Sequence, residues 1–373
     1  MKSTKNNLYL IPNPSIQIVV GYKNCAIIDL VRETTSIAKN SIYYFIQENE
    51  RISLAKIYEK YDSQRDILEE YLNFFIKNEY VFLGTLKDVH RFQKLNVDWN
   101  RPSHITNAVI EYSDLYGDFL NQTISQLSEL CVEGIELFIP NSVTLSLTSS
   151  IISEFNMLSH LTSFNVYLEY DDCRTEDEYV LFLTQHQWIN VLVLNFPYSQ
   201  KRGNITFLNK NFSLSNCGII DRKYFINNLP FFTEAQHHNT CLNRKVCIDA
   251  NGDIKNCPAM KKSYGNIRDT TLKEAIEKPG FKDCWTICKD EIDVCKDCEF
   301  RYMCTDCRSF IKDPENPYSQ PAKCTYNPYI CLWEGQDGYV PVEECGNYSR
   351  ETGFVPNKDK ITELNKQIWG EEQ

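Results

Sequence analysis

Twelve of the sixteen cysteines lie between Cys241 and Cys345, and this crowding limits what the chain can fold into more than any other feature. Disulfides staple small secreted domains that cannot build a core, but a chain of 373 residues is long enough to build one. The first twenty residues lack the long apolar run and cleavage site of a secretory signal. We therefore expect a cytoplasmic protein with reduced thiols, in which dense cysteines indicate metal ligands.

The composition argues against two classes of partner. The net charge of −11 opposes nucleic-acid binding, because an acidic surface repels a polyanion. No apolar stretch approaches the roughly eighteen residues that a membrane-spanning helix needs. We therefore expect neither a nucleic acid nor a membrane among the partners.

The spacing of the cysteines bears on which metal they bind. The segment CKDCEFRYMCTDCR (residues 295–308) holds two C-x-x-C pairs separated by only five residues. Zinc ribbons separate such pairs by about a dozen residues or more. The short separation favours iron–sulfur clusters, which share neighbouring cysteines between them, over a zinc site, which stays open as the alternative. Eight thiols suffice for two four-cysteine clusters: Cys241, Cys247, Cys257, Cys295, Cys298, Cys304, Cys307 and Cys324.

The remaining eight cysteines fall into two sets. Four stand far apart in the first 220 residues, and we expect them to pack as small hydrophobic side chains: Cys25, Cys131, Cys173 and Cys217. The other four lie among the predicted ligands, and for them we expect packing, with a role as spare ligands as the alternative: Cys284, Cys288, Cys331 and Cys345.

Local signals predict a hairpin and a helix within this region. KVCIDANGDIKNCP reads as a β-hairpin with its turn at residues 251–252, where Asn-Gly tolerates positive φ. This hairpin would bring Cys247 and Cys257 near each other. Thr271 and Glu274 have the spacing of a capping box, which predicts the start of a helix.

Three segments and a later cysteine resemble the SPASM domain: CLNRKVCIDANGDIKNCPAM, YGNI and CKDCEFRYMCTDCR. That domain is the auxiliary-cluster module of radical SAM peptide-modifying proteins. The last pair is C-x2-C here, where the family has C-x3-C. The resemblance implies two 4Fe–4S clusters. It assigns one cluster to Cys241, Cys247, Cys257 and Cys307, and the other to Cys295, Cys298, Cys304 and Cys324.

Residues 100–235 alternate between predicted strands and helices, which implies parallel strands with helical crossovers. The predicted strands cover residues 107–113, 135–140, 164–170 and 191–197, and the helices cover residues 117–130, 144–158 and 176–187. The resemblance identifies this part as a partial radical-SAM-like (β/α) barrel. Radical SAM enzymes carry C-x3-C-x2-C after the first strand, but IEYSDLYGDF contains no cysteine. We therefore expect a degenerate barrel that does not use S-adenosylmethionine.

The first 95 residues have the pattern of a winged helix, with short strands, three helices and a further strand. DNA binding is the commonest use of this pattern, but the third helix, DILEEYLNFF, is acidic. The arrangement resembles the RiPP recognition element, which binds a leader peptide as an extra strand of its small sheet. We expect the edge that receives this strand within residues 17–30.

Taken together, the chain resembles the SPASM-domain peptide maturase of grasp-with-spasm systems, and KDCEFRYMCTDCR and CTYNPYICLWE are the closest segments. The resemblance implies an α/β fold and two partners, a precursor peptide and an ATP-grasp ligase. It divides the chain into a leader-binding domain (1–95), a barrel (100–235), a SPASM domain (236–345) and a tail (346–373). Whether the protein is an enzyme that modifies the peptide or a scaffold that presents it stays open.

Overall fold

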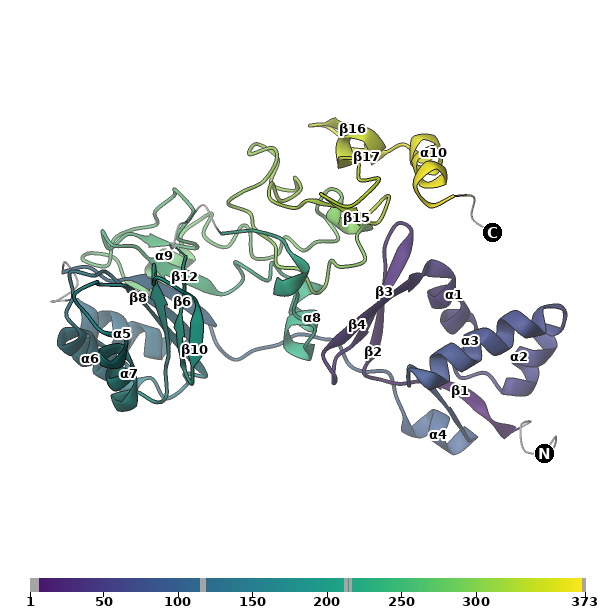
Figure 1. Cartoon of the computed structure of the whole chain (residues 1–373), viewed down its shortest axis with the longest axis horizontal. Coiled ribbons are helices and arrows are strands. Elements are labelled where there is room, and N and C mark those ends of the chain that lie inside the picture. Colours follow the sequence, from purple (N-terminus) through teal and green to yellow (C-terminus); the bar gives the residue numbers. More distant parts are fainter. Residues whose placement is uncertain (1–6, 115–118, 211–213, 215–216, 371–373) are drawn as a thin grey trace.

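The computed structural model describes residues 7–114, 119–210, 214 and 217–370, and it shows a mixed α/β chain with an eight-stranded sheet (Figure 1). The N-terminal module lies at one end of the molecule, and the eight-stranded sheet lies at the other. Long loops from the cysteine-rich region connect the two (Figure 1).

The eight-stranded sheet is mostly parallel, as the alternating pattern predicts. Its order is β10-β11-β9-β8-β7-β6-β12-β13, and only the two edge strands, β10 and β13, pair in antiparallel fashion. The strands are β6 (Asn107–Glu111), β7 (Gly134–Ile139), β8 (Ser163–Glu169), β9 (Asn190–Leu194), β10 (Gln200–Arg202), β11 (Ile205–Phe207), β12 (Lys245–Ile248) and β13 (Ile254–Lys255). The loop after β6 is the segment in which the sequence lacks the C-x3-C-x2-C motif. Residues 115–118 of this loop lie outside the described residues.

One face of this sheet forms the largest hydrophobic core. Four helices cover that face: α5 (Leu120–Glu129), α6 (Leu145–Glu154), α7 (Glu176–Gln185) and α9 (Leu272–Glu277). Since side chains alternate along a strand, the residues between the core positions point to the opposite face. They include Glu136 and Tyr167 on the central strands and Lys245 and Cys247 on β12. This face of the sheet is therefore more polar and faces the cysteine-rich loops.

The predicted hairpin forms, but it belongs to the large sheet rather than to a separate domain. β12 and β13 pair with each other, and the turn residue Gly252 has φ +84°. β12 also pairs in parallel with β6, and Val246 and Ile248 contribute to the main core. The expected boundary between residues 235 and 236 therefore does not separate two cores, because residues on both sides of it share one.

The described helices are short, and several are capped as the sequence indicates. The Thr271 side chain accepts from the Glu274 backbone at 3.2 Å, and the Glu274 carboxylate accepts from the Thr271 backbone at 2.8 Å, which confirms the capping box. The longest of the described helices, α3 (Arg65–Lys77), has 13 residues. In the described part of the chain, no helix combines the length and apolar character needed to cross a membrane.

The N-terminal module is built on a three-stranded antiparallel sheet with the order β2-β3-β4. Its elements are β1 (Tyr9–Pro12), β2 (Ile16–Val20), β3 (Asn24–Asp29), β4 (Thr34–Lys39), α1 (Asn40–Asn49), α2 (Leu54–Lys60), α3, β5 (Val81–Gly84) and α4 (Leu86–Arg91). β1 and β5 form a separate antiparallel pair. One face of the three-stranded sheet, including Cys25 and Ile27, packs against the helices.

The other face of the three-stranded sheet packs on the cysteine-rich region. Ala26 and Ile28 share a core with Phe300 and Met303. The β2–β3 turn approaches so closely that a Cβ atom on Gly21 would lie 2.7 Å from the backbone nitrogen of Glu299. The N-terminal module and the cysteine-rich region are therefore joined by a common core, and not by a linker alone.

The C-terminal 28 residues, which we expected to be a tail, are folded over their described part. They form the hairpin β16 (Gly346–Ser349) and β17 (Gly353–Pro356), followed by α10 (Lys358–Trp369). Phe354 and Ile361 share a core with Tyr329 and Cys345, so this unit crosses the expected boundary after residue 345. α10 also reaches the N-terminal module, because Lys23 donates to Asn365 at 2.7 Å.

Candidate metal centres

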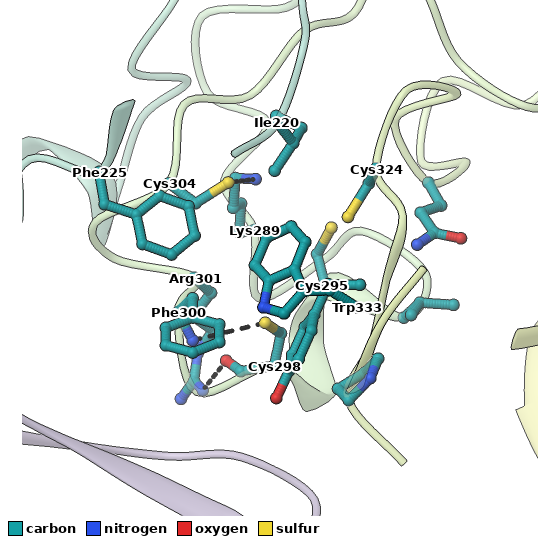
Figure 2. A pocket seen from close by; sticks show the side chains of 14 residues that line it. Ile220, Phe225, Lys289, Cys295, Cys298, Phe300, Arg301, Cys304, Cys324 and Trp333 are labelled. Atoms are coloured by element: carbon teal, nitrogen blue, oxygen red, sulfur yellow. Dashed lines mark hydrogen bonds between the residues drawn. The ribbon is translucent and has the colours of Figure 1, made fainter. Parts of the chain in front are cut away.

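Four of the predicted ligands line a single pocket. The sulfur atoms of Cys295, Cys298, Cys304 and Cys324 point into the space between them (Figure 2). This space measures about 350 Å³ with its opening to solvent included. Phe300 and Trp333 form part of its wall. The arrangement agrees with the second set of ligands that the resemblance implies. We call it the aromatic-walled pocket.

A buried lysine supplies positive charge to the aromatic-walled pocket. Lys289 is 5% exposed, and its Nζ donates to the Cys304 sulfur at 3.2 Å. Burial alone would lower the pKa of Lys289, but the sulfur atoms of Cys304 and Cys295 outweigh burial and raise it. Burial raises the pKa of Cys295 to about 12, and Lys289 acts in the opposite direction. A bound metal ion favours the thiolate form of such buried cysteines, because it compensates the cost of burying their negative charge.

A second group of thiols, Cys241, Cys257 and Cys307, lies beside β12, and we call it the strand-side group. Cys241 accepts from Lys245 Nζ at 3.6 Å, and Cys257 accepts from Ser309 at 3.9 Å. The β12–β13 register places Cys247 opposite Lys255, so Cys257 lies level with Lys245. Burial raises the pKa of Cys307, and Cys241 and Cys257 raise it further.

Buried hydrogen bonds hold the strand-side group together across a long stretch of sequence. Asn239 accepts from the backbone of Cys241 at 3.0 Å and donates to Asp306 at 2.6 Å. Asp306 also accepts from Arg308 at 2.5 Å, and both side chains of this ion pair are 2% exposed. Asp306 therefore fixes the position of its neighbour Cys307 relative to Cys241.

Two further cysteines, Cys217 and Cys247, have thiols of the strand-side group among their neighbours. Burial raises the pKa of Cys247 well above its ordinary value, and Glu111, Cys257 and Asp249 add to this effect. Burial also raises the pKa of Cys217, as do Cys257 and Cys241. Cys217, which we expected to pack as a small hydrophobic side chain, is partly buried and also has these predicted ligands among its neighbours. A lone cysteine in the sequence gives no signal of such a position.

The spacing of the thiols allows a test of what they fit. A tetrahedral zinc site has Zn–S bonds of about 2.3 Å, so its sulfur atoms lie about 3.8 Å apart. Across the residues described by the structure, no three cysteine sulfurs lie within 4.8 Å of one another. The group that does meet this distance is Asp171, Asp172 and Cys173, of which two members are exposed. Neither set of thiols is therefore as close together as a tetrahedral zinc site requires, whereas an iron–sulfur cluster holds thiolates that lie further apart.

The other cysteines mostly follow the packing expectation. Cys25 and Cys345 are fully buried, and the Cys345 sulfur accepts from Asn327 at 3.3 Å. Cys284 packs beside Cys295 in a small apolar cluster. Cys173 contradicts the expectation, because it is exposed in a loop after β8. The sequence signal for its exposure is the pair of acidic residues, Asp171 and Asp172, that precedes it.

The three-stranded sheet offers a candidate site for an extended peptide. The expected range, residues 17–30, covers β2 and β3, but β3 pairs with strands on both sides and has no free edge. β4 forms one of the two sheet edges, and most of its side chains are exposed. A peptide can add to such an edge through main-chain hydrogen bonds. The structure therefore leaves the outer side of β2, which lies in the expected range, as one candidate edge and adds β4 as the other.

Comparisons with known proteins found similar structures but no similar sequence. No protein-family model matches the sequence, and no curated protein is significantly similar to it. The chain is similar to Streptococcus suis SuiB bound to S-adenosylmethionine, with 11% identity and a TM-score of 0.31. It is equally similar to SuiB bound to the precursor peptide SuiA, with 11% identity and a TM-score of 0.30. Each match covers 84% of this chain and 98% of SuiB, and the low scores indicate a coarse relationship.

Proposed function

We propose that this protein takes part in the maturation of a ribosomally synthesised precursor peptide, together with an ATP-grasp ligase. In this proposal the leader of the precursor adds as a strand to the edge at β4. One observation carries it: the sheet with this edge packs its other face directly on the loop that holds Cys298. Peptide binding and the candidate metal centre thus belong to one continuous structure.

The proposal places a 4Fe–4S cluster in each of the two sets of thiols. When bound, such clusters supply electron transfer or structural cross-links. The roles of the protein's own residues follow from their contacts. Lys289 and Lys245 each donate to a cysteine sulfur and offset the negative charge of the thiolates. Asn239 and Asp306 hold two ligands in position through buried hydrogen bonds.

The metal content tests this proposal directly. We expect protein purified without oxygen to carry about eight irons and as many sulfides per chain, because two cubanes require them. Its absorbance should show a broad band near roughly 400 nm, from charge transfer between thiolate and iron. Iron, sulfide and zinc analysis on the same sample checks both points. Stoichiometric zinc with iron near zero would favour the zinc alternative instead.

Between an enzyme and a scaffold, we propose the scaffold, because the sequence of residues 110–119 contains no cysteine. The S-adenosylmethionine sulfonium chelates an iron that three cysteines leave open, and this segment supplies none. We therefore expect no 5′-deoxyadenosine when the protein is incubated with S-adenosylmethionine and a strong reductant. Liquid chromatography with mass detection checks the product.

The cysteines outside the two sets provide the control for this experiment. Cys284 and Cys288 have a C-x3-C spacing and could replace a ligand, which would free an iron for chelation. We expect the double variant Cys284→Ser/Cys288→Ser to leave both the background rate and the product made with the ligase unchanged. Formation of 5′-deoxyadenosine that falls in this variant would contradict the scaffold and restore the enzyme.

A further inference from the structure

The strand-side group contains one thiol too many for a single cubane. Cys241, Cys257 and Cys307 lie together, and both Cys217 and Cys247 approach them. A 4Fe–4S cluster takes four cysteine ligands. The spacing in the sequence points to Cys247, but the surroundings of the two candidates differ.

The backbone beside Cys217 is pressed against a ligand of the strand-side group. Gly218 has φ +75°, and a Cβ atom on it would lie 2.7 Å from the Cys307 sulfur and 2.8 Å from the Cys307 Cβ. Only glycine permits this approach, because any other side chain would occupy the space of that sulfur. The carbonyl oxygen of Cys217 accepts from Lys323 Nζ at 2.5 Å, which ties this segment to the loop that carries Cys324. The position of Cys217 is thus fixed from two directions.

The charged side chains beside the two candidates differ. Lys245 and Lys323 both act on Cys217 as neighbouring cations. The neighbours of Cys247 include the carboxylates of Glu111 and Asp249, and Lys255, a cation beside Cys247, forms an ion pair with Asp249 at 2.5 Å. A cluster bound by four thiolates is anionic, so cations beside a ligand stabilise it and carboxylates oppose it.

We infer that Cys217, rather than Cys247, is the fourth thiolate ligand of the strand-side group. This inference rests on the proposed function, because it takes for granted that a cluster binds there. In this inference Cys247 is a buried thiol on β12, the strand that lies between β6 and β13 in the large sheet. One ligand of this centre, Cys217, then comes from the segment that links the barrel to the cysteine-rich region.

Iron content and electron paramagnetic resonance of the full-length chain test the inference without any assay of activity. The variants are Cys217→Ala, Cys247→Ala and, as a control in the barrel, Cys131→Ala, each purified without oxygen. We expect Cys217→Ala to fall from about eight irons to about four, with loss of one of two reduced-cluster signals. Cys247→Ala and Cys131→Ala should keep about eight irons and both signals.

The outcomes separate this inference from the proposed function. Wild-type protein without iron overturns both. The ligand assignment alone is overturned if the wild-type protein carries both clusters and Cys217→Ala retains both. It is also overturned if Cys247→Ala loses a cluster. If Cys217→Ala loses all iron, Cys217→Ser decides, because a serine oxygen can replace the thiolate and retain the cluster. A changed resonance signal in Cys217→Ser supports the assignment, and an unchanged signal overturns it.

Discussion

Removal of the metal should unfold the region from residue 284 to residue 324 while the parallel sheet stays folded. Within that region the structure shows one three-residue helical turn, Cys295–Asp297, and a small apolar cluster around Ile287 and Ile292, and its other apolar contacts are mainly those of Phe300 and Met303 with the N-terminal module. Structural metals contribute about 10 kcal/mol or more of binding free energy, which such a region cannot replace. We therefore expect the free energy of unfolding of this region to fall by at least about 5 kcal/mol, which exceeds what holds most small domains together.

Hydrogen exchange read by mass spectrometry measures this effect peptide by peptide. Oxidation followed by chelation removes the metal, and the metal-free and metal-bound proteins are compared. Peptides from β7 and β8 serve as the internal reference, because their core contains none of the predicted ligands. The Cys173→Ala variant is the matched control, since that cysteine is exposed and far from both sets in the sequence. Full protection of residues 284–324 after metal removal would contradict the prediction.

One of two neighbouring proline substitutions in β4 should weaken leader binding at least about tenfold without unfolding the protein. Successive backbone N–H groups of a strand point to opposite sides. Of the N–H groups of Ser36 and Ile37, one therefore points toward β3 and the other points away from the sheet. Proline removes this donor and is tolerated only where it faces away from the sheet. The tolerated variant should bind the leader at least about tenfold more weakly, since the lost hydrogen bond costs roughly 1.4 kcal/mol or more of binding free energy.

Fluorescence anisotropy of a labelled leader peptide measures binding to the full-length chain, and thermal unfolding identifies the tolerated variant. The Ser36 hydroxyl accepts from Tyr80 at 2.8 Å, so Ser36→Ala serves as a control for the loss of that bond. If the tolerated proline variant binds the leader as tightly as the wild type, β4 is not the binding edge. The outer side of β2 would then be the remaining edge of the sheet.

Features set by a few adjacent residues could be predicted from the sequence. The Asn-Gly turn formed at residues 251–252, and the capping box formed at Thr271 and Glu274, because each depends on short-range hydrogen bonds. The gathering of Cys295, Cys298 and Cys304 likewise follows from their short separation. The start of α10 carried a similar signal, since Asn357 caps it by accepting from Lys360 at 3.1 Å, but we missed it.

Features set by contacts between distant segments could not be predicted in this way. The parallel pairing of β12 with β6 joins residues 245–248 to residues 107–110, and no local pattern encodes such a pairing. The position of Cys217 depends on the contact of Gly218 with Cys307, about ninety residues later. The second edge of the three-stranded sheet, β4, was not predicted for the same reason, because β4 is polar and exposed and lacks the apolar pattern of a strand.

The shared core beneath the three-stranded sheet has a consequence for engineering. Val19, Ala26 and Ile28 pack directly on Phe300 and Met303, so the N-terminal module is not an interchangeable adaptor. A chimaera that exchanges residues 1–95 for the corresponding module of a homologue would bring in a mismatched surface at this contact. Retargeting the protein to a new peptide is therefore better attempted by substitutions along β4, most of whose side chains face solvent, than by exchange of the whole module.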